Sequence, residues 1–406
     1  MKMKRAFSFT PARDGMLLAA GTSFIAMTYG LVRMAYGLFL PDVQAELSFD
    51  AAAAGLISSG ASLSYCVGAL IGLRAGAAHP RRLVIGAGLC AGIGSAGMAA
   101  AMQPGVFAAF AILSSTGAGL ASPALVSIIG RNVERRDNDR AQSIVNAGTG
   151  PGLIVAGVLA LVLLPNWRLP WFVVAGFTIV VAALVLRLDR ARTHRSVDEN
   201  RLPPRSWFGA HGHIIAAALL MGAGSAAVWT FGRAHLVESG ASEPVSIGAW
   251  IALGIGGTAV IATARWMSHF RPRAAWAVSV SVVAGATVML GITPGFTALA
   301  LVACVAFGWG YTAATGALIA WTLERDFGRA ATGTSLLFVA LVLGQALGAT
   351  AAGAVAAVWG LAAAFVLAAV VTGAAVAVPH WPKTVNETPQ PERRSKQWDA
   401  PLTSCD

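Results

Sequence analysis

The chain consists largely of apolar runs that are long enough to cross a lipid bilayer. Twelve runs can be placed, at approximately residues 15–40, 51–73, 83–101, 105–130, 141–164, 168–187, 212–234, 246–265, 274–293, 296–322, 331–356 and 359–379. A helix rises about 1.5 Å per residue and the hydrocarbon core is about 30 Å thick, so each run can span it. Charged residues make up 12% of the chain, against about 25% in soluble domains. The sequence therefore predicts an all-α integral membrane protein with twelve transmembrane helices.

The positive charges are distributed unequally between the two sides that such helices would create. With the N-terminus inside, all but three of the 29 Lys and Arg fall in cytoplasmic segments; Arg168 lies outside, and Arg33 and Arg233 lie within runs. Lys and Arg are retained on the cytoplasmic side of a membrane. We therefore expect a multi-pass protein of the bacterial inner (plasma) membrane with both termini in the cytoplasm. The net charge of +11 then needs no nucleic-acid partner.

A long polar interruption, "RLDRARTHRSVDENRLPPRSWFGAHGH" (Arg187 to His213), divides the runs six and six. We expect a cytoplasmic N-terminal tail at 1–14, a six-helix bundle at 15–187, a cytoplasmic central loop at 188–211, a second six-helix bundle at 212–379 and a disordered cytoplasmic tail at 380–406. The fourth and tenth runs share Gly-x-Gly and a later Glu-Arg, which indicates an internal duplication. An offset of 200 then aligns Tyr29 with Trp229 and Arg33 with Arg233.

Arg33 lies inside the first apolar run, in "YGLVRMAYG" (Tyr29 to Gly37). A charge there costs from about 2.5 to more than 10 kcal/mol unless it faces a partner, a wet cavity or an interface. Residues three, four or seven apart share a helix face, so a polar stripe forms in the first run and another in the seventh. We interpret Arg33 as a cation of a substrate pathway; the alternative is an arginine that reaches the nearer interface.

Further polar residues fall in the middle of other runs, notably Asn146, Tyr311 and Gln345. Each alone is more often an interhelical hydrogen-bonding residue than a ligand contact, but together they favour a polar central cavity. The candidate substrate-pathway residues are Thr22, Tyr29, Arg33, Tyr36, Asn146, Ser225, Trp229, Arg233, Tyr311 and Gln345.

All eighteen Asp and Glu lie outside the runs or at their edges. No carboxylate is then available within the membrane to pair with Arg33, and its counter-ion is expected to be the substrate or backbone carbonyls. Proton coupling would have to use the substrate, a histidine, or Asp42 and Glu46 at the outer mouth. His235 is interpreted as a residue of a wet loop.

Two six-span halves, a long basic central loop and arginines in the short loops together resemble the major facilitator superfamily over residues 15–380. The second loop is similar to the glycine–acid–arginine signature of that family at Gly72, Arg81 and Arg82, although Gly76 replaces its acid and His79 a glycine. The resemblance implies a role in conformational gating for the three matching residues. In the fourth run, Leu113 stands where the family pattern has arginine, so its proton-coupling role is not carried over.

The fifth run contains "NAGTGPG" (Asn146 to Gly152), which resembles the Gly-Pro signature of antiporting members. The resemblance implies a second set of gating residues, Gly148, Gly150, Pro151 and Gly152; the alternative is a packing kink, because proline removes a helix hydrogen bond and glycines allow close approach. "GLVRMAYGLFLP" (Gly30 to Pro41) is similar to a pattern in little-characterised bacterial members.

These observations predict a secondary active transporter that moves a small organic solute by alternating access. Arg33 favours an anionic solute. The resemblance of the fifth run to antiporting members implies a proton antiporter or exporter. The alternatives are an uncoupled facilitator, a symporter for uptake, or a sensor on a transporter scaffold. A channel is less favoured because no repeated filter loop occurs.

No metalloprotease, nucleophile-elbow or phosphate-loop motif occurs, so we expect neither an enzyme nor a cofactor or metal. The expected partners are the solute, protons and the lipid bilayer, with no nucleic acid, and the expected state is a monomer.

Overall fold

The computed structural model describes residues 12–134, 137–190, 203–326 and 329–378, and its regular elements are helices. In the first half these are α1 (Ala12–Ile25), the π-helix η1 (Ala26–Met34), α2 (Tyr36–Leu47), α3 (Ala51–Ala75), α4 (Pro80–Ala100), α5 (Pro104–Asn132), α6 (Asn138–Asn146), α7 (Thr149–Leu163) and α8 (Arg168–Leu188). In the second half they are α9 (Arg205–Glu238), α10 (Glu243–Met267), α11 (Pro272–Ile292), α12 (Thr297–Arg325) and α13 (Ala330–Ala377).

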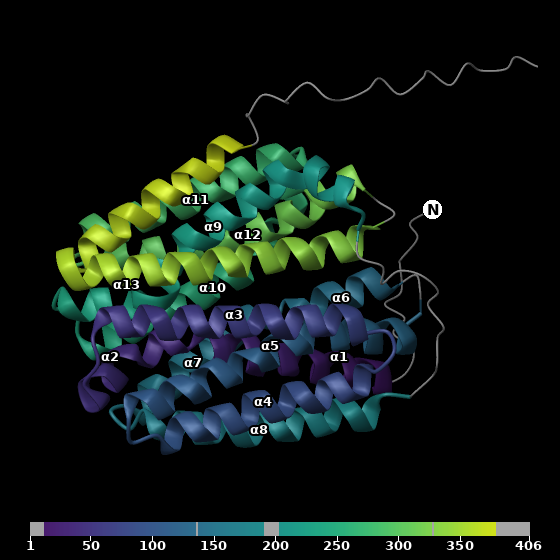
Figure 1. Ribbon diagram of the computed structural model, residues 1–406, viewed down its shortest axis with the longest axis horizontal. Coiled ribbons are helices and arrows are strands. Elements are labelled where there is room, and N and C mark those ends of the chain that lie inside the picture. The colour runs from purple at the N-terminus through teal and green to yellow at the C-terminus, as the bar shows by residue number, and fades with distance from the viewer. Residues whose placement is uncertain (1–11, 135–136, 191–202, 327–328, 379–406) are drawn as a thin grey trace, which may run out of the picture.

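The helices form two bundles that lie side by side. Figure 1 shows the helices of the first half, from purple to blue, below those of the second half, from teal to yellow. Three helix pairs join the bundles: α3 lies along α13, α7 along α10, and α2 along α9. The expected all-α architecture of two helical bundles is thereby confirmed.

The last element, α13, consists of two helices. Its backbone is non-helical at Gly360, where φ is 81° and ψ is 167°, and Figure 1 shows the chain turning back along α11. Only glycine adopts such a conformation without strain. In the described part of the chain, eleven helical segments are long and apolar enough to cross a membrane, and this break divides the last of them, which accounts for the twelve predicted spans.

Large apolar side chains are exposed on the outer surface of the helices. Val162, Trp359 and Val370 are 73%, 71% and 66% exposed. Most of the buried positions belong instead to small residues and a few large aromatic ones such as Trp250 and Trp276. Without water, every backbone polar group must bond within the helix, which is why only helices span here. This is the surface expected of a protein whose solvent is lipid.

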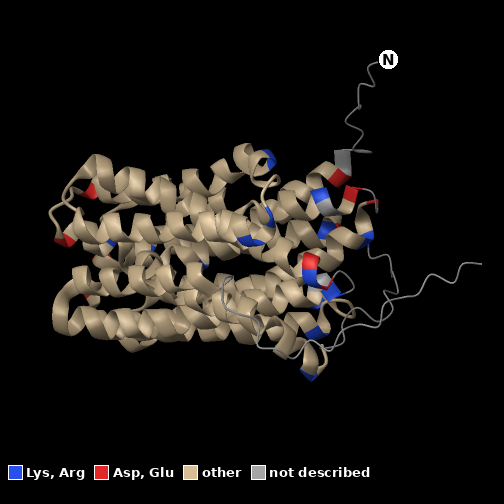
Figure 2. Ribbon diagram, turned by 90° about the horizontal axis from the view of Figure 1, so that it is seen from above, with Lys and Arg blue, Asp and Glu red and all other residues tan. Residues whose placement is uncertain are grey.

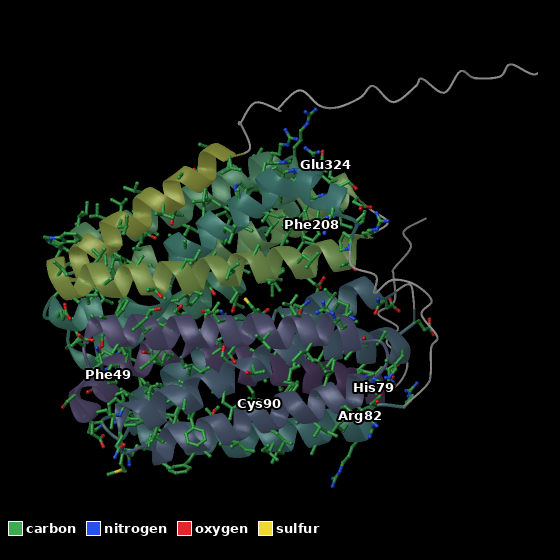
Figure 3. The ribbon with its side chains drawn as sticks, viewed as in Figure 1. Phe49, His79, Arg82, Cys90, Phe208 and Glu324 are labelled. Atoms are coloured by element: carbon green, nitrogen blue, oxygen red, sulfur yellow. The ribbon has the colours of Figure 1, made fainter. Side chains whose placement is uncertain are left out.

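Charge divides the molecule into two ends. Figure 2 shows Lys and Arg gathered at one end of the helices, which we call the basic end. In Figure 3 His79 and Arg82 lie at the basic end and Phe49 lies at the opposite end, which we call the far end. The expectations for residues 1–11 of the N-terminal tail, for the tail 380–406 and for residues 191–202, which are half of the loop 188–211, fall outside the described residues.

Two helices extend beyond their predicted runs. α2 continues through Pro41 to Leu47, so Asp42 and Glu46 lie on a helix and not in a loop. α9 begins at Arg205, before the predicted residue 212, and continues to Glu238. The interpretation of His235 as a wet loop residue is therefore wrong: its side chain is 4% exposed and stacks on Phe365 at 4.6 Å between ring centroids.

The first span changes helix type where it carries Arg33. η1, a π-helix of nine residues, separates α1 from α2. π-helical turns place i→i+5 hydrogen bonds in the helix and are frequent at functional sites. Close packing accompanies this change, because a Cβ built on Gly30 would lie 2.6 Å from the Cα of Gly152 in α7.

Candidate functional site

Arg33 lies between the two bundles, and groups from both bundles contact it. Its guanidinium stands over the ring of Tyr65, 4.6 Å from the centroid, and donates a hydrogen bond of 2.7 Å to Oε1 of Gln345. Tyr65 comes from α3 of the first bundle and Gln345 from α13 of the second. A cation over an aromatic face gains from about 0.5 to 2 kcal/mol, the larger value where water is excluded. The position of the guanidinium is thus fixed by packing as well as by hydrogen bonding.

Gln345 links Arg33 to a second polar side chain. Its side chain is 4% exposed, and its amide nitrogen donates a hydrogen bond of 2.9 Å to the hydroxyl of Tyr311 on α12. Below Arg33, the hydroxyls of Tyr29 and Tyr65 are 2.6 Å apart. The hydrogen bonds from Arg33 to Gln345 and from Gln345 to Tyr311 therefore connect the two bundles, and the cation–π contact with Tyr65 joins the tyrosine pair to this network. Three of the predicted pathway residues, Arg33, Tyr311 and Gln345, meet in it.

A small cavity of about 40 Å³ adjoins this network. Its lining comes from both bundles and includes Arg33, Tyr36, Ser58, Trp229, Thr230 and Gln345. Such a volume holds water but is far below the roughly 300 Å³ or more of a typical ligand pocket. The site is therefore closed around its polar groups in this conformation.

Trp229 forms the aromatic part of the lining. Its ring makes edge-on contacts with Phe307 and Tyr311, at 5.4 Å and 5.2 Å between centroids, and with Trp250 at 6.2 Å. Aromatic pairs prefer such arrangements. We call these four residues the aromatic wall.

The electrostatic balance at Arg33, a half-buried arginine between the bundles, differs from that of the paired arginines. Within the described residues, no carboxylate lies within the 4.0 Å ion-pair distance of its guanidinium. Elsewhere in the structure, Arg81, Arg131, Arg168, Arg190, Arg233 and Arg329 each form an ion pair. A desolvated charge without a counter-ion is costly. The arrangement can hold an anion supplied from outside.

Arg233 has a different environment from Arg33. Its side chain is 2% exposed and forms an ion pair with Asp42 of α2. It also donates to the carbonyl of Leu38 at 2.6 Å and to the hydroxyl of Ser246 at 3.2 Å. Arg233 is not part of the cavity lining. We call the contact of Asp42 with Arg233 the far-end ion pair, and it joins the two bundles between Arg33 and the far end.

The contacts between α2 and α9 show which part of the first span lies opposite Arg233. Asp42 and Leu38 contact Arg233 across separations of 191 and 195 residues. Arg233 therefore lies opposite residues that are five to nine positions beyond Arg33 on the first span. Arg33 and Arg233 consequently lie at different depths.

The remaining predicted pathway residues are not all brought to the cavity. The hydroxyl of Tyr36 donates to the carbonyl of Ala54 at 3.0 Å. Thr22 packs inside the first bundle, where its hydroxyl donates a long hydrogen bond of 3.4 Å to the carbonyl of Ile144. Ser225 is buried, and its hydroxyl donates to the carbonyl of Gly222. Asn146 is exposed at the end of α6, away from the lining.

The first set of predicted gating residues lies at the basic end. A Cβ built on Gly72 would lie 2.6 Å from Pro123 of α5. Arg81 donates to Asp189 at 3.0 Å, and Arg82 is exposed. Asp189 has a fully buried side chain that also accepts from Arg131 and Asn132. Burial alone would raise the pKa of Asp189, but the hydrogen bonds from Arg131, Asn132 and Arg81 outweigh it and lower that pKa.

The second set lies where the fifth span is broken. α6 ends at Asn146 and α7 begins at Thr149, so Pro151 lies in the first turn of α7, where a missing N–H costs little. Gly148 and Gly152 pack against the backbone of α1 and η1, and Gly150 packs against Thr258 of α10 in the other bundle. The segment from Gly148 to Gly152 therefore contacts both the first span and α10 of the other bundle.

Several contacts of the site were not predicted from the sequence, although the sequence points to Asp42 as a candidate for proton coupling. Tyr65 supports Arg33, Asp42 pairs with Arg233, and the hydroxyls of Ser58 and Thr230 are 2.8 Å apart across the bundles. Residues of these types occur commonly in apolar helices, so their identity alone does not mark a site. Only the non-local packing brings them together, and the one available signal was a lone acid one residue beyond Pro41.

The chain was compared with known proteins. A family model described as Major Facilitator Superfamily matches residues 22–332. No curated protein sequence matches. Among solved structures, the nucleoside transporter NupG is 12% identical with a TM-score of 0.74, covering 92% of this chain and 100% of its own. A bacterial homologue of the human lysosomal transporter Spinster, in an inward-facing and occupied conformation, is 17% identical with a TM-score of 0.69, covering 90% and 95%. A D-xylose–proton symporter is 13% identical with a TM-score of 0.70, covering 90% and 96%. At these identities the likeness is one of fold.

Proposed function

Because this chain belongs to the Major Facilitator Superfamily, we propose that it is a secondary active transporter whose solutes are small organic anions. The single observation that carries the choice of anions is the guanidinium of Arg33, which lies between the bundles with Gln345 and Tyr65 as neighbours and, in the described part of the chain, no carboxylate within ion-pair distance. Charge-assisted hydrogen bonds are about twice as strong as neutral ones. An anion therefore gains more from this position than a neutral or cationic solute.

Alternating access in this proposal uses the bundles as two rigid bodies. The far-end ion pair and the bond between Ser58 and Thr230 close the path on the far side. Opening at the basic end admits the solute, and the reverse movement breaks these contacts. The positive-inside rule supports a cytoplasmic location for the basic end in a bacterial inner membrane. We propose that the protein works as a monomer, since each chain contains both halves of the site.

The experiment is a ligand screen by thermal melting of the purified protein in detergent. Organic anions, neutral amides and organic cations are compared on the wild type and on Arg33→Gln, Arg33→Lys and, as control, Arg265→Gln, which removes an exposed arginine at the basic end. A ligand at a hundredfold excess over its dissociation constant stabilises the folded state by about 2.7 kcal/mol. We expect stabilisation by anions only, about 10- to 100-fold weaker binding in Arg33→Gln, and no change in Arg265→Gln. Equal stabilisation of all variants by neutral or cationic compounds contradicts the proposal.

We further propose that transport exchanges the solute for protons. The support is the fifth-span segment, whose glycines pack against η1 on one side and α10 on the other, together with its resemblance to antiporting members. Purified protein in liposomes separates the alternatives: an imposed pH gradient drives an antiporter or a symporter in opposite directions. A transport rate that does not respond to the gradient leaves an uncoupled facilitator.

A further inference from the structure

The residues that line the cavity adjoining Arg33 indicate the chemical groups of the solute as well as its charge. Arg33 is the one charged residue among the described residues that line it. A single guanidinium balances a single negative charge, whereas phosphate groups with nearly two charges are usually held by several donors and cations. The lining therefore favours a monoanion such as a carboxylate.

Few polar groups remain in the lining for a solute with many hydroxyls. Ser58 and Thr230 hydrogen-bond to each other. Tyr36 donates to the carbonyl of Ala54, so Ser62 has the one remaining side-chain hydroxyl among the described lining residues. The amide of Gln345 already bonds to Arg33 through its oxygen and to Tyr311 through its nitrogen. Specific sites provide placed polar partners for polar ligand groups. This lining provides too few of them for a sugar acid.

The second bundle provides a flat apolar surface instead. Trp229 lines the cavity and is held edge-on by Trp250, Phe307 and Tyr311. It is 9% exposed, and its indole N–H, like those of Trp171, Trp207, Trp250 and Trp321, has no hydrogen-bond partner in the described part of the structure; among these five, Trp229 is the one that lines the cavity. Buried donors are nearly always paired. A ring bearing an acceptor would complete this surface.

We propose that the solute is an aromatic monocarboxylate, with its carboxylate on Arg33 and its ring against Trp229. An oxygen substituent on the ring accepts from the indole N–H. The inference rests on the proposed function, because Arg33 provides the charge in both. It adds the aromatic ring as the feature that the second bundle recognises.

The first test needs only the wild-type protein. Dissociation constants are measured for benzoate, 4-hydroxybenzoate, cyclohexanecarboxylate and glucuronate. Aromatic contacts favour benzoate over its saturated counterpart, and we expect about threefold to tenfold tighter binding. We also expect 4-hydroxybenzoate to bind more tightly than benzoate. Equal or tighter binding of cyclohexanecarboxylate or glucuronate overturns the inference.

Two variants at one position separate the ring from the N–H. Trp229→Phe keeps an aromatic side chain and removes the donor, so the preference for 4-hydroxybenzoate is lost while that for benzoate over cyclohexanecarboxylate remains. Trp229→Leu abolishes both preferences. The control is Trp359→Phe, at a position that is 71% exposed on α13. Unchanged preferences in Trp229→Leu overturn the inference, and if this variant does not fold the wild-type ratios still decide.

The two proposals fail in different ways. Carboxylates that bind in an Arg33-dependent manner without aromatic preference overturn this inference and leave the proposed function in place. If no carboxylate binds and Arg33→Gln behaves as the wild type, the proposed function fails as well.

Discussion

At the scale of the residue, the two arginines inside the membrane show what a buried charge requires. Arg233 has a carboxylate, a carbonyl and a hydroxyl as partners. Arg33 has an amide oxygen and an aromatic face. The partners of Arg233 include a negative charge and neutralise it, whereas the partners of Arg33 are uncharged. Arg233 is therefore structural in our interpretation, and Arg33 is left to bind a ligand.

Removing one partner of the far-end ion pair should destabilise the protein strongly. Asp42→Asn leaves the buried guanidinium of Arg233 without a counter-ion, and we expect a loss of about 3 kcal/mol. Thermal melting in detergent measures it, with Glu243→Gln, an exposed acid at the start of α10, as control. In the double variant Asp42→Asn/Arg233→Gln the losses should be less than additive. Strict additivity would mean that the two side chains do not interact.

Asp189 predicts a dependence of stability on acid pH. Because its pKa in the folded protein is below the ordinary value of 3.8, the stabilisation is fully present above that pH and is lost as the pH falls through the lowered pKa. Asp189→Asn should therefore melt at a lower temperature at pH 7, and its difference from the wild type should narrow below about pH 3.8. The control is Glu324→Gln, which removes an exposed carboxylate at the same end (Figure 3). A difference that is constant with pH would exclude this ion cluster as its cause.

At the scale of the element, the first span shows where prediction from the sequence ends. Its existence and direction follow from an apolar run with basic residues before it. The change to a π-helix at Ala26 and the continuation through Pro41 do not, because both depend on neighbours. Gly30 allows η1 to approach Gly152, and proline is tolerated inside transmembrane helices because surrounding groups satisfy the freed carbonyl.

Close packing of η1 against α7 can be tested by adding one methyl group. In Gly30→Ala the new Cβ would lie 2.6 Å from the Cα of Gly152, so one helix must move. Overpacking costs about 1 to 3 kcal/mol, and ligand binding at Arg33 should weaken because η1 positions it. Gly285→Ala in α11 is the matched control, since nothing lies within 4 Å of its Cβ. Equal melting temperatures for the two variants would show that η1 and α7 are not in close contact.

At the scale of the whole molecule, the twelve spans, the two bundles and the basic end were all predictable, because hydropathy and the distribution of Lys and Arg are properties of the chain alone. The partners of the site residues were not. Gln345 was predicted as a polar residue in the eleventh span, yet its bond to Arg33 joins residues 312 positions apart. Asn146 had the same kind of signal and is exposed. Only the relative placement of the bundles distinguishes the two.

Movement of the bundles relative to each other can be tested with paired cysteines. The hydroxyls of Ser58 and Thr230 are 2.8 Å apart across the bundles, so a disulfide in Ser58→Cys/Thr230→Cys should stop transport until a reductant is added. Ser64 and Thr116 form the same kind of pair within the first bundle. Ser64→Cys/Thr116→Cys should therefore remain active when oxidised. Full activity of the oxidised cross-bundle variant would exclude separation of the far end during transport.

The hydrogen bond from Arg33 to Gln345 has a consequence for selectivity. Without solute, the amide oxygen of Gln345 accepts a hydrogen bond from Arg33 that a bound solute would accept instead. Gln345 therefore competes with the solute for the guanidinium of Arg33. A neutral solute that displaces it exchanges one uncharged acceptor for another and gains little. A carboxylate replaces a dipole with a full charge and gains the difference. Under the proposed function, this hydrogen bond would disfavour uncharged metabolites relative to carboxylates without any steric filter.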